Sequence, residues 1–335
     1  RLAIAIFESV KDLPLLCPHG HVDPQLFVDP AARFADPTNL FIKPDHYLFR
    51  MLYSQGVSLE SLGFEGKASL PETVERDPRK IWQRFASNYH LFLGTPSASW
   101  FREVLSGVFG VHEVLSADNA LAIYEYLNDL LAQEAYSPRR LFERFYIQAL
   151  CTTDSASDPL AAHLAIKDSL WQGRVLPSFR PDKLTNLANP HWAAELSALA
   201  AINGKAICSY GEFLEALQDR RLFFKQLGAK ATDHDAPEPY TAEVPEEEMA
   251  AIFRRALAGK AEPGDGRRFS GGMLMEMARM SCEDGLVMQI HAGSYRNHNL
   301  SLFEQYGADM GADIPMRTEF TRNLAPLLQR FGNAK

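Results

Sequence analysis

The chain has 335 residues, of which 46% are hydrophobic and 23% are charged. This is the composition of an ordinary globular protein, and the length allows one large α/β domain or two smaller ones. A formal net charge of -8 argues against nucleic acid and against an anionic membrane surface as the main partner, but it does not exclude a local anion site.

The four cysteines lie far apart and form no C-x-x-C pair, which indicates isolated thiols rather than a disulfide framework or a zinc finger. No segment has the roughly 18 consecutive apolar residues that a membrane span needs. The apolar start of the chain is followed at once by Glu8, Lys11 and Asp12, so we expect no signal peptide. The sequence therefore predicts a cytoplasmic protein, and we expect it to form a homo-oligomer.

Short apolar runs, each followed by polar residues, predict five β-strands. They cover residues 13–16, 145–151, 174–179, 221–230 and 285–291. Between the later runs, amphipathic patterns predict helices at 158–173, 210–220 and 245–259. Strand, polar loop and helix in alternation are typical of parallel βαβ units, which place their chemistry where the strands end.

The segment 30–144 does not follow this alternation, because its amphipathic patterns are all helical. We therefore expect three parts: strand one with its polar motif (1–29), a helical insertion (30–144) and the remaining βα units (145–335). Residues 233–248, rich in proline and acids, predict a long surface loop. The five predicted strands are fewer than the eight that a closed (β/α)₈ barrel needs.

The segment PHGHVDP (18–24) places His19 and His21 just past the first predicted strand. Because side chains alternate along an extended chain, both imidazoles face the same side. Two neutral imidazoles on one face can bind a single divalent ion, whereas the other interpretation is a polar turn that happens to contain histidines. The position at a strand end favours the metal site.

Two further stretches carry candidate catalytic and binding residues. KPDHYLFR (43–50) brings together His46, Tyr47 and Arg50, which provide a proton donor or acceptor and a carboxylate clamp. The alternative is an aromatic helix face capped by an aspartate. Arg180 in FRPD (179–182) can clamp a carboxylate bidentately, or it forms a salt bridge with Asp182.

The last two predicted strands add four more candidates. Asp233 and His234 in TDHD follow the fourth strand, either as substrate contacts or as cap and loop polarity. His291 closes the fifth strand, where a histidine needs a polar partner, and we expect it to be a third metal ligand. Arg296 follows as a candidate substrate contact. The sequence has no glycine-rich phosphate loop and no G-x-S-x-G elbow, which favours metal-assisted or cofactor-free chemistry on a small polar molecule.

From about residue 13 to the end, eight ordered motifs resemble the uronate (glucuronate) isomerase family of the amidohydrolase superfamily. They are PHGHVDP, DHYLFR, GTPSASWF with VFGV, ALCTTDSASD, PSFRPD, TDHD, IHAGSYRNHN and NLAPLLQRFG. The resemblance implies a distorted (β/α)₈ TIM-like barrel with a helical insertion after strand one. It also implies aldose–ketose isomerisation of hexuronates through an enediol, converting D-glucuronate to D-fructuronate or D-galacturonate to D-tagaturonate.

By the same resemblance, His19 and His21 would be ligands of a divalent metal, usually Zn²⁺. Tyr47 with His46 would line the reacting carbons, and Arg180 would hold the carboxylate of the uronate sugar. The family's last third carries the final barrel strands and a D-x-R motif, and we expect these strands and this motif to be missing from this chain. The alternatives are a metal-dependent hydrolase or decarboxylase of the same superfamily, and an inactive fragment.

Overall fold

The computed structural model describes residues 1–334, which divide into two compact units. The first unit comprises residues 1–28, 142–293 and the chain from 316 onwards, and the second comprises 29–141 and 294–315. Within the described residues, none of the helices has the length and apolar character that crossing a membrane would require.

The first unit is built on parallel strands. One sheet has the order β1 (Leu15–Cys17), β2 (Ile147–Cys151), β4 (Val175–Leu176). The other has the order β3 (Asp154–Ser155), β5 (Phe179–Arg180), β6 (Ala231–Ala236), β7 (Val287–Ala292).

These two sheets form one array, because β2 and β3 are halves of one strand and β4 and β5 are halves of the next. Backbone hydrogen bonds join the two broken strands from Leu150 N to Arg174 O (2.9 Å) as far as Ala156 N to Arg180 O (3.0 Å). Among residues 1–334, the result is an array of five parallel strands in chain order, which confirms the predicted α/β class. The closed eight-stranded barrel remains a prediction.

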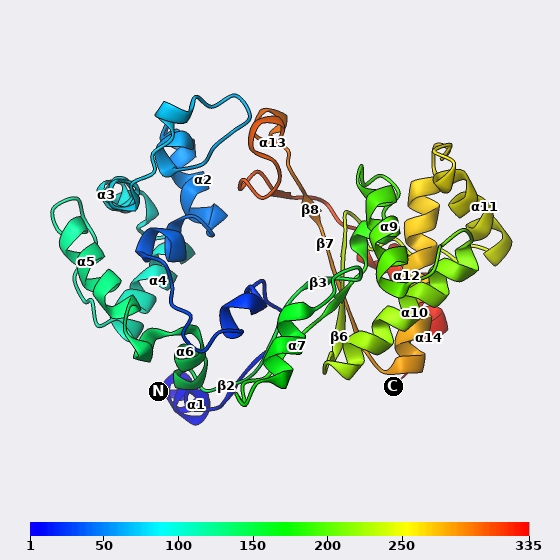
Figure 1. Ribbon diagram of the computed structural model, residues 1–335, viewed down its shortest axis with the longest axis horizontal. Helices are drawn as coiled ribbons and strands as arrows, with labels where there is room; N and C mark the ends of the chain where they lie inside the picture. Colours follow the sequence, from blue (N-terminus) through cyan, green and yellow to red (C-terminus); the bar gives the residue numbers. More distant parts are fainter. Residues whose placement is uncertain (335) are drawn as a thin grey trace. The chain divides into compact units, whose positions relative to one another are not determined.

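Helices gather on one side of β6, as Figure 1 shows for α9 to α12. The helices of the first unit are α1 (Leu2–Val10), α7 (Ala161–Asp168), α8 (Asp182–Thr185), α9 (Trp192–Asn203), α10 (Tyr210–Gln226), α11 (Glu246–Leu257), α12 (Asp265–Asp284) and α14 (Phe320–Phe331). Their core includes Phe213 stacked on Phe253, with ring centroids 5.1 Å apart. Phe179 of β5 packs edge-on against Phe224 of α10, and this contact fixes the strand that ends in Arg180.

The predicted strand at 221–230 is wrong. Residues 221–226 belong to α10, where Arg221 and Phe224 are buried at helical spacing, and the fourth strand is β6. An apolar run alone does not separate a buried helix from a strand, and β6 gives little apolar signal because its sequence is ATDHDA. Asp233 and His234 therefore lie within a strand rather than after it, and the predicted loop at 233–248 begins only after Ala236.

The second unit is mainly helical. It contains α2 (His46–Ser54), α3 (Pro78–Ser87), α4 (Pro96–Glu103), α5 (Ala120–Leu131) and α13 (Leu300–Tyr306), with a small antiparallel pair β8 (Ser294–Tyr295) and β9 (Ile314–Pro315). The helix α6 (Pro138–Arg144) crosses the sequence boundary between the units. The core is aromatic: Trp82 is fully buried with Phe85 and Phe101, and its indole N–H donates to Ala120 O at 2.9 Å.

The second unit differs from the predicted helical insertion in one respect, because residues 294–315 return to it. The sequence pattern predicted residues 294–315 to be part of the later βα units. Tyr306 Oη donates to Glu60 Oε1 at 2.5 Å, and Lys67 N donates to Gln305 O at 2.9 Å. These are tertiary contacts between segments more than 200 residues apart, which no local pattern reveals.

Candidate active site

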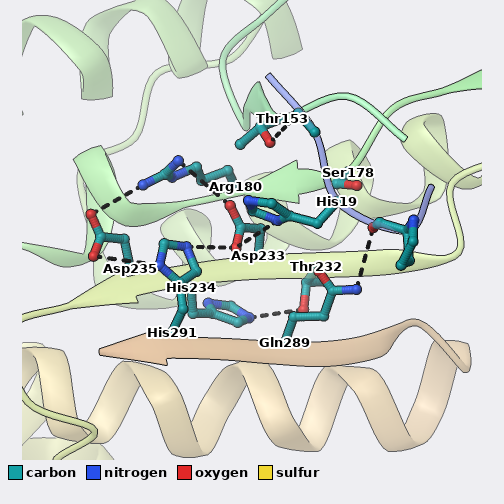
Figure 2. Close-up of polar contacts among 12 residues, drawn as sticks. His19, Thr153, Ser178, Arg180, Thr232, Asp233, His234, Asp235, Gln289 and His291 are labelled. Carbon is teal, nitrogen blue, oxygen red and sulfur yellow. Dashed lines mark hydrogen bonds and ion pairs between the residues drawn. The ribbon is translucent and has the colours of Figure 1, made fainter. Parts of the chain in front are cut away.

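The two histidines of the H-x-H motif follow β1 directly, as predicted. Their Nε2 atoms lie 3.2 Å apart, and His19 Nδ1 lies 3.8 Å from Asp233 Oδ1. Figure 2 shows His19, Arg180 and His291 gathered around the carboxylate of Asp233. The ends of β1, β5, β6 and β7 thus place their polar side chains together, as parallel strands do in α/β proteins.

Asp233 is the centre of this cluster and is completely buried. Its Oδ1 lies 2.8 Å from His291 Nε2, but the two groups are not oriented for a hydrogen bond. Within the described chain, both Asp233 oxygens and His291 Nε2 are therefore buried polar atoms without a hydrogen-bond partner. Such atoms are costly, and a bound water or ion commonly satisfies them.

The charges around Asp233 control its ionisation. Burial by itself raises the pKa of Asp233, but His291, Arg180 and His19 outweigh burial and hold the pKa below its usual range. The contact with Asp233 raises the pKa of His291. Burial, followed by the charge of His19, lowers the pKa of His21, which favours the neutral imidazole that a metal requires.

Arg180 meets three aspartates. Its Nε lies 2.5 Å from Asp182 Oδ2, its Nη1 3.5 Å from Asp233 Oδ2 and its Nη2 3.1 Å from Asp235 Oδ2. The alternative salt bridge to Asp182 is confirmed, while Asp235 was not predicted. Burial raises the pKa of Asp182 to about 6, although Arg180 opposes this shift. The Arg180 side chain is 24% exposed.

His234 does not join the cluster. Since side chains alternate along β6, it points to the opposite face from Asp233, beside Thr232 (Figure 2). Its Nε2 lies 2.8 Å from Thr232 Oγ1, and burial lowers the pKa of the imidazole to about 3. The imidazole is therefore neutral, and His234 lines a cavity together with Asp182 and Asp235, so its predicted role as a substrate contact stays a prediction.

The candidates His46, Tyr47 and Arg50 belong to the second unit, at the start of α2. Asp45 caps this helix by accepting from Tyr47 N at 2.8 Å, as the alternative interpretation of the motif has it. The rings of His46 and Tyr47 lie 4.5 Å apart between centroids, and the Arg50 guanidinium lies 5.4 Å from the centre of the Tyr47 ring. Arg50 also donates to Gly311 O at 3.3 Å, so its guanidinium contacts both the Tyr47 ring and the Gly311 carbonyl.

Arg296 also lies in the second unit, just after β8. Its Nη1 lies 3.0 Å from Asp313 Oδ2, and Asn297 N donates to Asp313 Oδ1 at 2.8 Å. These contacts join the two ends of the segment that connects β8 and β9, so the ion pair of Arg296 with Asp313 is a structural one.

Two cavities open in the first unit. One of about 450 Å³ borders the cluster and is lined in part by Asp182, His234 and Asp235. Its volume is in the range of small-molecule sites. A larger one of about 790 Å³ lies between α10, α11, α12 and α14 and includes none of the cluster residues.

The donor types in the cluster suit a divalent metal, because histidine nitrogen and carboxylate oxygen are ordinary ligands of zinc. The Asp233 oxygens and His291 Nε2, which form ion pairs but no hydrogen bonds among the described residues, leave room for a further partner. As they stand, the side chains of residues 1–334 contain no group of three or more His, Cys, Asp or Glu already arranged around one ion. The metal site is therefore supported by donor chemistry rather than by a complete coordination shell.

A family model described as glucuronate isomerase matches residues 1–335. The chain belongs to the glucuronate isomerase family. A uronate isomerase from Nostoc punctiforme is 54% identical over 333 residues, which cover 99% of this chain and 70% of the relative. One from Phenylobacterium zucineum is 47% identical over 334 residues, which cover 100% of this chain and 69% of the relative. The predicted enzyme class, uronate isomerase, is confirmed.

Solved structures of glucuronate isomerase family members have the same fold. The glucuronate isomerase from Caulobacter crescentus matches with a TM-score of 0.94 and 45% identity, over 99% of this chain and 68% of that one. The uronate isomerase from Thermotoga maritima matches with a TM-score of 0.91 and 27% identity, over 99% of this chain and 71% of that one. The α/β fold with parallel strands is therefore that of glucuronate isomerases.

Proposed function

We propose that the first unit binds a hexuronate beside a divalent metal ion, Zn²⁺ by expectation, and that His19, His21 and His291 hold that ion. The observation that carries this proposal is the buried Asp233 carboxylate, which has no hydrogen-bond partner among residues 1–334 although it lies beside two imidazoles and a guanidinium. A bound cation would supply the missing partner and would polarise the substrate oxygens when bound.

Aldose–ketose isomerisation moves the proton on C2 to C1, while the hydroxyl proton on O2 leaves and O1 gains one. We assign the carbon-to-carbon transfer to the Tyr47 hydroxyl, with His46 beside it, because a phenol both donates and accepts a proton. Asp233, kept ionised by its neighbours, accepts the proton from O2 and returns it to O1, so that the carboxylate is ionised again at the end of the reaction. The remaining N–H groups of Arg180 hold the uronate carboxylate, since a guanidinium presents five donors.

The (β/α)₈ barrel belongs to the same proposal. Gln289 of β7, the last strand of the array, donates to Pro18 O just after β1, the first strand, at 3.4 Å. This contact between the first and the last strand of the array supports a curled array of the barrel type. The cytoplasmic location and the homo-oligomer also remain predictions.

The reaction is tested with D-glucuronate and D-galacturonate in D₂O, followed by NMR. We expect ketose to form, and Tyr47→Phe to lower turnover by roughly 100-fold or more, as loss of a general acid–base group does. Tyr53→Phe, on the same helix and also exposed, is the matched control.

Two results would contradict the proposal. Hydrolysis of amides or lactones in place of ketose formation would favour the hydrolase alternative, and no turnover of any uronate would favour the inactive alternative. Near-normal turnover of Tyr47→Phe would remove Tyr47 from the proton transfer.

A further inference from the structure

The peptide between the two motif histidines lies unusually close to a neighbouring strand. A Cβ atom on Gly20 would lie 3.1 Å from Cys151 O, at the end of β2. On the same side, Thr153 Oγ1 donates to Gly20 O at 2.8 Å (Figure 2). Thr153 is half-buried in the break between β2 and β3. The backbone between His19 and His21 is thus held by a side chain 133 positions later in the chain.

A second side chain holds the other flank of His19. Gln289 Nε2 donates to Pro18 O at 3.4 Å (Figure 2). Gln289 is paired in register with Asp233 across β6 and β7, and it precedes His291 by two positions on the same strand. Gln289 therefore ties the start of the motif to the two strands that carry the other cluster residues.

These two bonds matter because the motif has no regular secondary structure of its own. The strand β1 ends at Cys17, and residues 18–22 lie outside any helix or strand. No sheet ladder fixes their backbone. The hydrogen bonds from Thr153 and Gln289 hold this backbone in place of a sheet ladder, and they limit where both imidazoles can point.

We infer that Thr153 and Gln289 are positioning residues that fix His19 and His21 through the backbone carbonyls of Gly20 and Pro18. This inference rests on the proposed function only for the identity of what the histidines bind. Groups that orient metal ligands without touching the metal typically change metal affinity by 10- to 100-fold. Thr153, with the shorter bond, has the larger effect of the two.

The test replaces the hydroxyl and keeps the branched shape. We expect Thr153→Val to weaken Zn²⁺ binding by roughly tenfold or more, measured by competition with a chelator, and Thr153→Ser to restore it because serine keeps the hydroxyl donor. Gln289→Met, which keeps the length and loses the donor, has a smaller effect in the same direction. Equal affinity of Thr153→Val and the parent chain would overturn the inference.

Thr38→Val is the matched control. Thr38 Oγ1 donates to Pro78 O at 2.6 Å, so this variant also loses one hydroxyl-to-carbonyl bond, in the second unit. It should lower stability without changing Zn²⁺ affinity. If Thr38→Val weakens Zn²⁺ binding as much as Thr153→Val, the effect is one of general stability and the inference is overturned.

Failure of the metal proposal has a different signature. It fails if His19→Ala binds Zn²⁺ as tightly as the parent chain. Crystal structures of the metal-free chain then decide the positioning role without any metal. A displaced Gly20 carbonyl and displaced imidazoles in Thr153→Val, restored in Thr153→Ser, support the inference, and unchanged positions overturn it.

Discussion

Asp233 Oδ1 and His291 Nε2 lie 2.8 Å apart on neighbouring strands, yet neither atom has a hydrogen-bond partner. Burying an unsatisfied carboxylate costs folding free energy. Proteins keep such costly groups mainly where function requires them. Asp233 and His291 are therefore expected to serve the function of the first unit rather than its stability.

Asp233→Asn tests whether Asp233 serves function rather than stability. The amide fills the same volume without the charge, so we expect turnover to fall by roughly 100-fold or more. The free energy of unfolding should fall as well, because an amide cannot replace the ion pairs of the carboxylate with His291 and Arg180. Turnover and chemical denaturation of the same preparation measure both. A large loss of stability with retained turnover would show that Asp233 is a structural residue.

Arg180 offsets the charge of three aspartates, and its removal tests whether it also holds the substrate carboxylate. We expect Arg180→Ala to lower kcat/KM on uronates by an amount equivalent to about 2–5 kcal/mol, the usual cost of losing one partner of a buried charge pair. Arg174→Ala is the control, since Arg174 is exposed just before β4, on the same broken strand as Arg180. Unchanged kcat/KM in Arg180→Ala would exclude the carboxylate clamp.

A second buried polar group lies away from the proposed metal ligands. Thr152 Oγ1 donates to Asp154 Oδ2 at 2.7 Å and lies 2.9 Å from His163 Nε2. Burial lowers the pKa of His163 to about 4 and raises the pKa of Asp154 to about 6. The two shifts have opposite effects on the dependence of stability on pH.

His163 has a lower pKa in the folded chain than its ordinary value of 6.5. Its contribution to stability is therefore complete above about pH 6.5 and is lost as the pH falls toward 4, because the unfolded chain binds the proton first. As the pH rises from about 4 to about 6.5, we expect the free energy of unfolding of the parent chain minus that of His163→Gln to increase by up to about 3 kcal/mol. Chemical denaturation at several pH values measures it.

Asp154→Asn should show the reverse trend. The folded pKa of Asp154 lies above its ordinary value of 3.8, so its contribution is complete below about pH 4 and is lost as the pH rises toward 6. The stability of the parent chain minus that of Asp154→Asn should therefore fall over that interval. Stability curves that stay parallel to the parent curve for both variants would contradict these two shifts.

Gly311 supports the helix that carries His46 and Tyr47. Its φ is +71°, and an added Cβ would lie 2.7 Å from Arg50 Cβ and 2.8 Å from His46 O. We expect Gly311→Ala to destabilise by more than the ~1–2 kcal/mol of a left-handed residue, because the start of α2 must also move. Turnover should fall with it.

Gly204 provides the control for this prediction. Its φ is +68°, and an added Cβ would meet no atom within 4 Å. Gly204→Ala should therefore cost only the backbone term and leave turnover unchanged. Equal losses of stability in the two alanine variants, measured by denaturation, would show that Gly311 does not constrain α2.

The sequence predicted the parts of the site that depend on local pattern. H-x-H after an apolar run predicted that His19 and His21 lie together just past the first strand, and their Nε2 atoms do lie 3.2 Å apart there. The strand carrying Asp233 was misplaced, because a strand of polar residues in a buried position has no hydrophobic signature. The cluster of aspartate and histidine in TDHD drew attention to these residues. They were predicted to follow a strand, and they lie within one.

The partners of the site residues were beyond prediction for a different reason. Asp235 lies in TDHD and Thr153 in ALCTTDSASD, but no local pattern shows which distant residue either of them contacts. The same is true of Gln289. The same holds for the contact of Arg50 with Gly311, 261 positions later. Only the tertiary fold decides which of many polar side chains meet.

The return of residues 294–315 to the helical unit has a consequence for how the chain is made. A ribosome delivers residues 29–141 long before Tyr306 and Gly311 exist to contact Glu60 and Arg50. The helical unit therefore cannot complete its contacts during the synthesis of its own main segment, and it must wait while the strands β2 to β7 emerge. At the usual 5–20 residues per second, that interval is on the order of ten seconds or more. Until then its aromatic core lacks one of its covering segments, which makes the nascent chain a natural substrate for chaperones.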